Sequence, residues 1–344
     1  MKILICASNM VHINNFNRPY IDEFKRLGHE AYIMASGEGA DFDIPFKKRS
    51  LSLKNALLSV KIKKIIKREK FDVVYLHTTL AAFWVRLALK GVKNRPIVVN
   101  TVHGYLFGGG FGKLHNKLYL SCERLVKKQT DYIFVMNNED EEIAKANSLA
   151  KLGVYKINGM GLDPQKRIIE KASPALPPKK LVYVGELNKR KNQIFLVRAL
   201  KHLENATLTL VGDGSQRQAI EKEIKRLGLE NRVTITGFTK NVSKYLSEAD
   251  MYVSASTVEG LPFNILEAME ASLPIVASNI KGQCDLLPSE CLYESGNMEE
   301  FISRVNDVKF ASYDISNYKL QSTLDNNMSL YLGIISNEKE LQSV

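Results

Sequence analysis

Cysteine and long apolar runs are both scarce in this chain of 344 residues. Its four cysteines lie far apart and form no CxxC pair, at positions Cys6, Cys122, Cys284 and Cys291. This spacing argues against a disulfide framework or a zinc ribbon and fits a reducing compartment. No segment approaches the roughly 18 consecutive apolar residues of a membrane-spanning helix. The opening MKILICASNM lacks the long core and small-residue cleavage site of a signal peptide, so we expect the chain to stay in the cytoplasm.

The overall composition is that of a globular protein. Apolar residues make up 45% of the chain and charged residues 25%, which excludes wholesale disorder and a collagen-like repeat. At about 150 residues per domain, the length predicts two domains.

The positive charge is concentrated in the first half of the chain. Residues 1–170 hold 28 basic and 16 acidic residues, a net charge of +12, whereas the remainder holds 20 and 21, a net charge of −1. This asymmetry predicts that one domain faces a polyanion, either nucleic acid or an anionic membrane.

Short β-branched runs alternate with helical patterns along the whole chain. The expected strands of the first half are 2–8, 30–35, 72–77, 96–102 and 131–136, and those of the second half are 180–185, 206–212, 232–237, 251–256 and 273–278. The expected helices of the first half lie near 15–27, 54–69, 80–90, 113–128 and 139–147. Such alternation indicates βαβ units and a parallel sheet in each half, an α/β architecture of two doubly wound domains.

A proline-rich break separates the two halves. ASPALPP (172–178) carries three prolines in seven residues, which is typical of a linker. We therefore predict a first domain at 1–170, a linker at 171–179, a second domain at 180–320 and a helical tail at 321–344 that could pack back on the first domain. In a doubly wound pair, the ligand is expected at the carboxyl ends of the strands, in a cleft that the two domains face.

The most specific segment is SASTVEGLPFNILEAMEASLPIVAS (254–278), which carries Glu259 and Glu267 eight residues apart. A strand ends near Ser254, and a helix begins near Pro262. The amides and positive dipole end of that helix can bind phosphate, and the two carboxylates can bind sugar hydroxyls on either side of a diphosphate. Taken alone, the two glutamates are explained as a helix-dipole partner and a solvated loop charge.

Two further loops favour a nucleotide site at the same edge of the sheet. VGELNKRKNQ (184–193) brings Lys189, Arg190 and Lys191 to the end of a strand, where cations can neutralise a leaving diphosphate. VGDGSQR (211–217) has two glycines that allow the backbone to approach a ligand. Each loop alone is an ordinary strand-to-helix connection, and it is their convergence that indicates a ligand site.

These motifs resemble those of the glycosyltransferase family-four enzymes, which have the two-domain GT-B fold. EGLPFNILEAM is similar to the family's E-x7-E segment, GELNKRKNQ to its G-R-L-x-x-x-K loop, and GDGSQR to its GDG turn. LPIVASNIKGQCDLL, NGMGLD and VHG match further family segments, so the resemblance covers nearly the full length and points to bacterial capsule and exopolysaccharide enzymes.

The resemblance implies a retaining sugar transfer from a nucleotide-sugar, with UDP expected as the nucleotide. Glu259 would contact hydroxyls of the transferred sugar, His103 would orient that sugar, Glu267 would bind the ribose and Lys191 the diphosphate. The implied donor-binding residues are Gly185, Arg190, Lys191, Gly212, Gly214, Gly260, Phe263, Asn264, Ile265 and Glu267. No cofactor and no metal are expected, because cations and helix dipoles can hold the diphosphate.

The sequence departs from the family pattern at two places. Glu186 stands where the family usually has arginine, so the cationic pair at the diphosphate is incomplete unless Lys189 or Arg190 substitutes. The loop after the first strand lacks the family's frequent double glycine, and Asn9 and His12 of this loop, together with His77, are candidates for the acceptor side.

Two basic helices account for the charge of the first half. On 54–69 the apolar face carries Leu58, Ile62, Ile65 and Ile66, and on 113–128 it carries Leu118, Cys122, Leu125 and Val126. The lysines and arginines of both helices take the other side, either as ordinary solvated faces or as a surface for anionic lipid. The basic stretches contain no nucleic-acid motif and no interleaved aromatics, so a membrane surface is favoured over nucleic acid.

Other motifs have simpler interpretations. Asp41-Phe42-Asp43 is a DxD triplet that we expect to be a solvated loop, and the acidic cluster 139–142 complements a helix dipole. YLFGGGFG (105–112) is either a loose surface loop or a mobile flap.

The sequence therefore predicts a cytoplasmic, peripherally membrane-attached glycosyltransferase that uses a nucleotide-sugar and a glycan or lipid-linked acceptor. A nucleotide-sugar epimerase and a non-catalytic nucleotide-sugar-binding protein remain alternatives. A dinucleotide oxidoreductase is disfavoured, because SNMVHINN rather than G-x-G-x-x-G follows the first strand.

Overall fold

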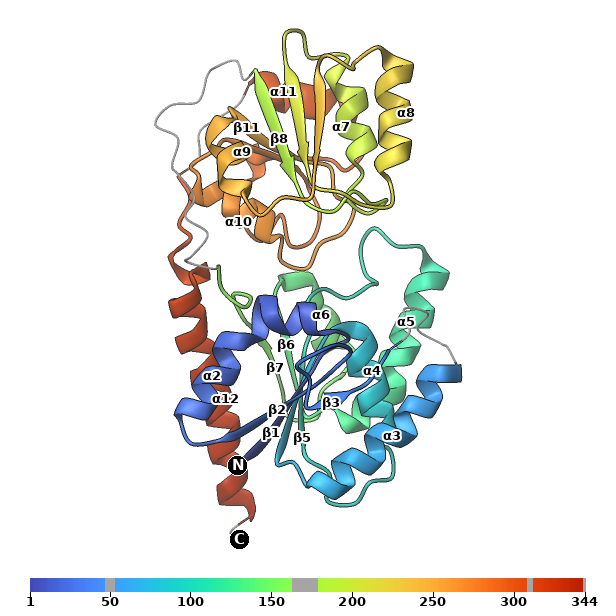
Figure 1. Ribbon diagram of the computed structural model, residues 1–344, viewed down its shortest axis with the longest axis vertical. Helices are drawn as coiled ribbons and strands as arrows, with labels where there is room; N and C mark the ends of the chain where they lie inside the picture. The colour runs from blue at the N-terminus through green and yellow to red at the C-terminus, as the bar shows by residue number, and fades with distance from the viewer. Residues whose placement is uncertain (47–52, 163–178, 308–311, 343–344) are drawn as a thin grey trace. The chain divides into compact units, whose positions relative to one another are not determined.

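The chain divides into two compact units, each built on its own parallel sheet. The computed structural model describes residues 1–46, 53–162, 179–307 and 312–342. The first unit comprises Met1–Gly161 with Leu320–Val344, and the second comprises Leu162–Lys319 (Figure 1). Of the predicted linker at 171–179, residues 171–178 lie outside the described residues.

Within the described residues, the sheet of the first unit has the order β3-β2-β1-β4-β5-β6-β7, and every pairing is parallel. The strands are β1 (Lys2–Cys6), β2 (Glu30–Ala35), β3 (Phe42–Asp43), β4 (Val73–His77), β5 (Ile97–Thr101), β6 (Tyr132–Val135) and β7 (Gly153–Lys156). The order reverses between β1 and β4, which makes their carboxyl ends a topological switch point. The short strands β3 and β7 were not among the expected ones.

Helices cover both faces of this sheet, which is why its central strands are mostly apolar and buried along their whole length. Every residue of β4 and β5 is buried. The principal helices are α2 (Arg18–Arg26), α3 (Leu53–Glu69), α4 (Thr79–Ala88), α5 (Lys113–Val126), which continues into η2 (Lys127–Gln129), and α6 (Asn138–Ala146).

The helix predicted near 15–27 is interrupted close to the switch point. A short α1 (Met10–His12) passes into a π-helical turn, η1 (Ile13–Asn17), before α2 begins. Pro19 lies in the first turn of α2, where its missing N–H costs no hydrogen bond. Single π-helical turns often accompany functional sites because they shift the side chains that follow.

The tail helix α12 (Leu320–Gln342) belongs to the first unit, where it lies beside α2 (Figure 1). Tyr331 inserts into an aromatic cluster, 4.5 Å from Tyr75 and stacked 5.3 Å from Phe134 between ring centroids. Asn327 donates to the hydroxyl of Tyr20 and to the carbonyl of Gly159, both at 2.9 Å. Among the described helices, none combines the length and the apolar character that crossing a bilayer requires.

The predicted apolar face of α5 is only partly buried: Val126 is buried and Cys122 is half-buried, but the prediction is wrong for the two leucines. Leu118 and Leu125 are 53% and 51% exposed, and Glu123 is buried instead. The buried Arg86 of α4 explains the difference: its guanidinium donates to both carboxylate oxygens of Glu123, at 2.8 and 3.0 Å. This bidentate pair holds Glu123 inside and turns the leucines outward. The prediction for α3 is confirmed, with Ile62, Ile65 and Ile66 buried and Leu58 half-buried.

The second unit repeats the architecture with the sheet order β10-β9-β8-β11-β12-β13 within its described residues. The strands are β8 (Lys180–Val184), β9 (Thr207–Val211), β10 (Val233–Gly237), β11 (Met251–Ser254), β12 (Ile275–Ser278) and β13 (Leu292–Tyr293). The helices are α7 (Gln193–Leu200), α8 (Arg217–Leu227), α9 (Val242–Glu248), α10 (Phe263–Glu270) and α11 (Met298–Asn306), with short turns η3 (Ser289–Cys291) and η4 (Ser316–Tyr318). Here the order reverses between β8 and β11.

Candidate functional site

In the second unit, the predicted donor residues lie at the carboxyl ends of neighbouring strands. The loops after β9, β8 and β11 carry the GDG turn, the basic triplet and the E-x7-E segment, and these three strands are adjacent in the sheet. The topology therefore places all three predicted loops at one edge, next to the switch point, where α/β sheets bind ligands.

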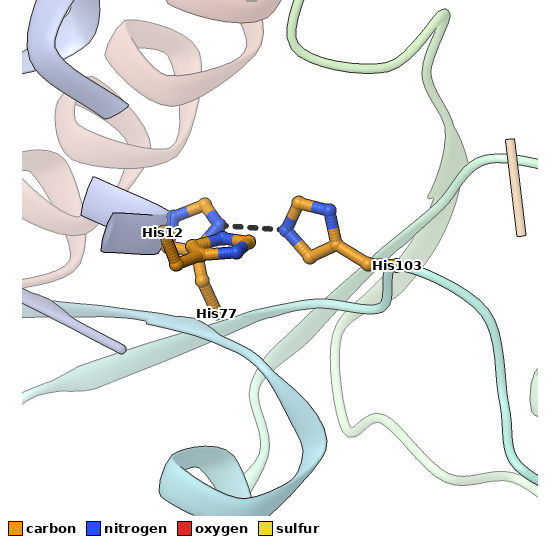
Figure 2. A group of neighbouring side chains, drawn as sticks. All are labelled: His12, His77 and His103. Atoms are coloured by element: carbon orange, nitrogen blue, oxygen red, sulfur yellow. Dashed lines mark hydrogen bonds between the residues drawn. The ribbon is translucent and has the colours of Figure 1, made fainter. Parts of the chain in front are cut away.

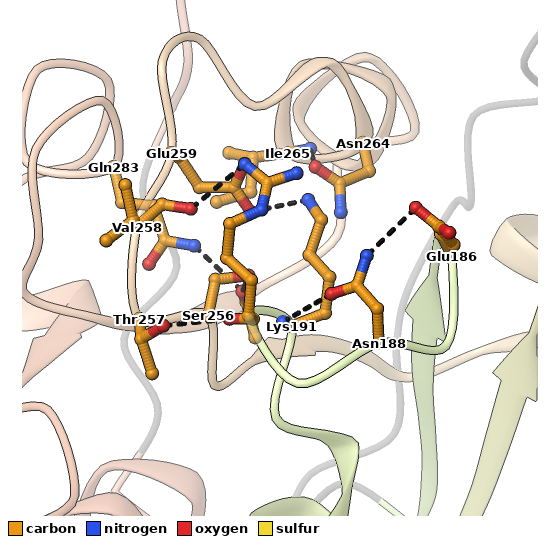
Figure 3. Close-up of polar contacts among 12 residues, drawn as sticks. Glu186, Asn188, Lys191, Ser256, Thr257, Val258, Glu259, Asn264, Ile265 and Gln283 are labelled. Carbon is orange, nitrogen blue, oxygen red and sulfur yellow. Dashed lines mark hydrogen bonds and ion pairs between the residues drawn. The ribbon is translucent and has the colours of Figure 1, made fainter. Parts of the chain in front are cut away.

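The centre of this group is an ion pair between two predicted site residues (Figure 3). Lys191 Nζ lies 2.5 Å from Glu259 Oε1, and Arg190 Nη1 lies 3.5 Å from Glu259 Oε2. Glu259 is only 4% exposed, whereas the Arg190 side chain is 44% exposed. One buried carboxylate thus has two cations beside it, one half-buried and one open to solvent.

Hydrogen bonds to backbone groups hold the two loops together. The carbonyl of Arg190 accepts from the amide of Thr257 at 2.8 Å, and Arg190 Nη1 donates to the carbonyl of Val258 at 3.3 Å. Since these contacts join residues 67 and 68 positions apart, the cations and Glu259 are held in register by the fold rather than by their side chains alone.

Glu186, which stands at the family's arginine position, points to a different neighbour. Its Oε2 accepts from Asn188 Nδ2 at 2.9 Å, and Asn188 Oδ1 accepts from the amide of Lys191 at 3.0 Å (Figure 3). Asn188, which the sequence reading did not single out, therefore fixes the turn that presents Lys191. The second cation at Glu259 is Arg190.

The predicted glycines pack the loops against one another. A Cβ on Gly212, whose φ is +147°, would lie 2.1 Å from the carbonyl oxygen of Gly185, and one on Gly214 would lie 2.4 Å from that of Leu187. Gly185 itself has a φ of +145°. A side chain at Gly212 or Gly214 would force the loops after β8 and β9 apart, so these glycines serve loop packing whether or not a ligand lies over them.

The helix α10 begins after Pro262 and follows the Glu259 loop directly. Of the amides expected to face a ligand, that of Ile265 already donates to the carbonyl of Pro262 at 3.0 Å and to Asn264 Oδ1 at 3.1 Å. Asn264 Nδ2 donates to the carbonyl of Val184 at 2.8 Å, so its side chain ties α10 to the end of β8. Glu267 is half-buried one turn further along the helix.

A buried polar cluster supports the loop that carries Glu259, and no motif in the sequence predicts it. Gln283 is fully buried; its Nε2 donates to Ser254 Oγ at 2.8 Å and its Oε1 accepts from Ser278 Oγ at 3.1 Å. Ser278 Oγ lies 2.5 Å from the carbonyl of Ser256. The amide therefore joins the ends of β11 and β12 under the loop that carries Glu259, a role that no sequence spacing indicates.

In the first unit, three histidines far apart in sequence come together at the carboxyl ends of β1, β4 and β5 (Figure 2). His12 and His77 were predicted for the acceptor side, and His103 for the transferred sugar. Burial lowers the pKa of His12 to about 4 and holds the pKa values of His77 and His103 well below the ordinary range, and neighbouring imidazoles add to the effect in these two. Asn9 lies at the same edge, where its Oδ1 accepts from the amide of His12 at 3.0 Å as the N-cap of α1.

The motifs that were set aside have structural roles. Asp41 Oδ2 accepts from the amide of Ile33 at 2.7 Å, and Asp43 Oδ1 accepts from that of Gly37 at 3.2 Å, so both carboxylates of the DxD triplet bind backbone.

The glycine-rich loop that follows His103 is tied to the acidic start of α6. The amide of Tyr105 donates to Asp140 Oδ2 at 3.0 Å, and that of Gly109 donates to Glu139 Oε1 at 2.6 Å. A Cβ at Gly108 would lie 2.2 Å from the latter oxygen. The acidic cluster thus holds this loop besides complementing the helix dipole.

Comparison with protein families divides the chain as the two units do. Residues 20–149 match the model for Glycosyltransferase Family 4, and residues 164–310 match the model for Glycosyl transferases group 1. The first match lies in the first unit and the second match lies in the second unit.

Relatives of known description share most of the chain. It is 28% identical over 331 residues to EpsD of Bacillus subtilis (strain 168), a protein named as a glycosyltransferase, covering 89% of this chain and 87% of that one. It is 27% identical over 335 residues to the UDP-Gal:alpha-D-GlcNAc-diphosphoundecaprenol alpha-1,3-galactosyltransferase of Escherichia coli, covering 86% and 84%.

Solved structures confirm the GT-B fold. The lipopolysaccharide outer core galactosyltransferase WaaB superposes with a TM-score of 0.72 at 18% identity, covering 97% of this chain and 99% of that one. Anabaena HepE in complex with UDP-glucose superposes with a TM-score of 0.68 at 20% identity, covering both chains fully.

Proposed function

This chain belongs to glycosyltransferase family four, and we propose that it transfers a sugar from a UDP-sugar to a lipid-linked glycan, with retention, in bacterial surface-polysaccharide assembly. The observation that carries this proposal is the arrangement of Lys191 and Arg190 on the carboxylate of Glu259, beside the N-terminus of α10. These groups can hold a diphosphate and a sugar hydroxyl at adjacent positions.

For the donor, we assign the diphosphate to Lys191 and Arg190. Arg190 takes the place of the family arginine that Glu186 replaces, because its guanidinium lies 3.5 Å from the carboxylate that Lys191 also contacts. Glu259 accepts hydrogen bonds from hydroxyls of the sugar, and Glu267 from the ribose. UDP is the favoured nucleotide because the named Escherichia coli relative uses UDP-Gal and HepE was solved with UDP-glucose.

For the chemistry, we propose stabilisation of the leaving diphosphate without a metal ion. Two cations and the positive end of α10 oppose the charge that develops as the bond to the sugar breaks. The acceptor hydroxyl, held close to the anomeric carbon, attacks from the face that the diphosphate leaves. The enzyme's contribution is then position and electrostatics, with His103 donating a hydrogen bond to the sugar.

For the acceptor, we propose that the first unit docks on the anionic inner face of the cell membrane through α5. Its exposed face carries Leu114, Leu118 and Leu125 at i, i+4 and i+11, which are 83%, 53% and 51% exposed. Lys113, Lys117, Arg124 and Lys128 are exposed beside this stripe. Apolar side chains flanked by basic ones suit an interface of acyl chains and anionic headgroups, where each cation contributes on the order of 1 kcal/mol.

The direct test is a transfer reaction in the presence of chelator. Purified protein is incubated with a panel of UDP-sugars and lipid-linked saccharides extracted from bacterial membranes. We expect UDP release that requires the acceptor, and a product whose new linkage has the anomeric configuration of the donor by NMR. Conversion of the UDP-sugar to an epimer without acceptor, or an inverted linkage, would contradict the proposal.

A further inference from the structure

Two of the three clustered histidines, His77 and His103, form a hydrogen-bonded series that begins at Asn17, and Figure 2 shows the contact between the two rings. Asn17 Nδ2 lies 3.0 Å from His77 Nε2, and His77 Nδ1 lies 3.1 Å from His103 Nε2. Asn17 and His77 are each 2% exposed, whereas His103 is half-buried. The series therefore runs from a buried amide to an imidazole that solvent and ligand can reach.

The direction of these hydrogen bonds follows from the donor capacity of each atom. An amide nitrogen can only donate, so His77 Nε2 accepts and carries no proton. A neutral imidazole keeps one N–H, so His77 Nδ1 carries the proton and donates to His103 Nε2. His103 Nε2 is then the acceptor, and the proton of neutral His103 is on Nδ1. Within the described residues, His103 Nδ1 has no hydrogen-bond partner, which leaves it for a ligand.

The backbone is irregular at Asn17 and directly after His77, and both irregularities help to hold these two side chains in place. Asn17 is the last residue of the π-helical turn η1, and a regular helix would turn its side chain elsewhere. Thr78, directly after His77, has a φ of +65°, a strained backbone conformation for a β-branched residue. The hydroxyl of Thr78 accepts from the amide of Ser8 at 3.0 Å and lies 2.6 Å from Ser8 Oγ, which holds this strained residue against the loop after β1.

We propose that Asn17 and His77 are positioning residues that fix His103 as its Nδ1–H tautomer, so that His103 donates a hydrogen bond to an oxygen of the bound sugar. The identity of that oxygen rests on the proposed function, whereas the tautomer rests on the hydrogen bonds alone. The ligand group at His103 must then be an acceptor, such as a hydroxyl oxygen.

Asn17→Asp is the most informative variant. A carboxylate can only accept, so it requires a proton on His77 Nε2. His77 Nδ1 then becomes an acceptor, and His103 must move its proton to Nε2 and present a bare Nδ1. Asn15→Asp is the matched control, because Asn15 is an exposed residue of the same π-helical turn and the charge change is identical.

The tautomers are read by NMR of the protein with ¹⁵N-labelled imidazoles, in chelator at pH 7.5, since the chain has only six histidines. We expect His103 protonated at Nδ1 in the native protein and in Asn15→Asp, and at Nε2 in Asn17→Asp. His103 protonated at Nε2 in the native protein, or unchanged by Asn17→Asp, would overturn the proposal.

Kinetics gives a second readout that a merely structural role would not move. In Asn17→Asp and His77→Leu, kcat should fall about tenfold or more while the Kd for UDP, which lacks the sugar, changes less than twofold. His77→Asn places an amide donor near the former Nδ1 and should restore much of kcat. Equal losses of kcat in His77→Asn and His77→Leu, with thermal unfolding unchanged, would count against a role of His77 in fixing the His103 tautomer.

A metal site is the competing explanation for the histidine cluster. One ring nitrogen from each of His12, His77 and His103 lies within 4.8 Å of the others, so the three could bind an ion. Stoichiometric Zn²⁺ binding by calorimetry that is lost in His77→Asn would overturn the proposal that Asn17 and His77 fix the His103 tautomer. The absence of Zn²⁺ binding would support that proposal. A native protein without transferase activity would refute the proposed function and leave the tautomer result standing.

Discussion

Lys191 Nζ and Glu259 Oε1 lie 2.5 Å apart, so the cation assigned to the diphosphate and the carboxylate assigned to the sugar are already paired. Without donor, Glu259 neutralises part of the charge that the diphosphate requires. We propose that the phosphates of a bound donor replace the carboxylate as partner of Lys191 and Arg190, which makes Glu259 available to the sugar. On this proposal, the ion pair links binding of the diphosphate to binding of the sugar.

The first prediction concerns Glu259→Gln. Removing the carboxylate releases Lys191 and Arg190, so the affinity for UDP should rise by roughly 3- to 10-fold, while sugar transfer falls about 100-fold because the sugar loses a charged hydrogen-bond acceptor. Calorimetry and the transfer assay measure the two effects. Glu248→Gln, an exposed position at the end of α9, is the control and should change neither. Weaker UDP binding in Glu259→Gln would disprove the competition.

The second prediction concerns the other carboxylate of the E-x7-E segment. Glu267→Ala should weaken donor binding by roughly 10- to 100-fold, because the ribose would lose a charge-assisted hydrogen bond. Glu270→Ala, one turn further along α10 and also half-buried, is the matched control and should bind UDP within about twofold of the native protein. An unchanged donor affinity in Glu267→Ala would remove this residue from the site.

The third prediction concerns the glycines. Gly212→Ala should destabilise the second unit by roughly 1–3 kcal/mol and weaken UDP binding, because its Cβ would meet the carbonyl of Gly185. Gly228 also has a positive φ, +67°, but there is open space where a Cβ would lie. Gly228→Ala should therefore lower the unfolding free energy by only about 1 kcal/mol and leave UDP binding intact. Thermal unfolding and calorimetry compare the two variants, and equal effects on UDP binding would argue against the loop-packing role.

The fourth prediction concerns pH. Burial lowers the pKa of His12 to about 4, so between pH 6.5 and about 4 the unfolded chain binds a proton that the folded chain does not. The unfolding free energy of the first unit should therefore fall as pH is lowered through this window, by up to roughly 3 kcal/mol from His12 alone, with His77 and His103 adding in the same direction.

Denaturant titrations followed by the fluorescence of Trp84, the one tryptophan of the chain, can measure this loss, because Trp84 lies buried in α4 of the first unit. His12→Phe should flatten the dependence on pH, whereas His202→Gln, an exposed position in the second unit, should not. If the unfolding free energy of His12→Phe depended on pH as steeply as that of the native protein, His12 would not be the cause of the loss.

The fifth prediction concerns the membrane surface. Changing Leu114 and Leu118 together to glutamine should lower binding to vesicles that contain anionic phosphatidylglycerol by roughly tenfold, since both side chains are exposed and their removal costs no core packing. Leu152→Gln, also exposed but between α6 and β7, should bind like the native protein. Sedimentation with vesicles measures both, and equal binding of all variants would exclude α5 as the docking face.

The alternation of strands and helices was enough to predict two parallel sheets and their βα loops, because burial on both faces makes central strands uniformly apolar. The leucines of α5 were predicted wrongly to share a buried face with Val126, because periodicity alone places a glutamate such as Glu123 outside. Glu123 is inside only because Arg86, 37 residues earlier, pairs with it.

In the candidate site, too, the sequence predicts some residues and not others. Lys191 and Glu259 stand in motifs that a sequence reveals, but the choice between Lys189 and Arg190 as second cation depends on the backbone contacts of Thr257 and Val258. Asn17 could not be predicted, because its contact with His77 spans 60 residues and depends on a π-helical turn that local propensity does not specify.

The most direct test of the account is a calorimetric titration of the native protein with UDP in chelator, with GDP, ADP and NAD as comparisons. We predict that UDP binds selectively without a metal ion, because Lys191, Arg190 and the α10 terminus hold the diphosphate. A folded protein that binds no nucleotide, or binds UDP only when a divalent cation is added, would contradict the account.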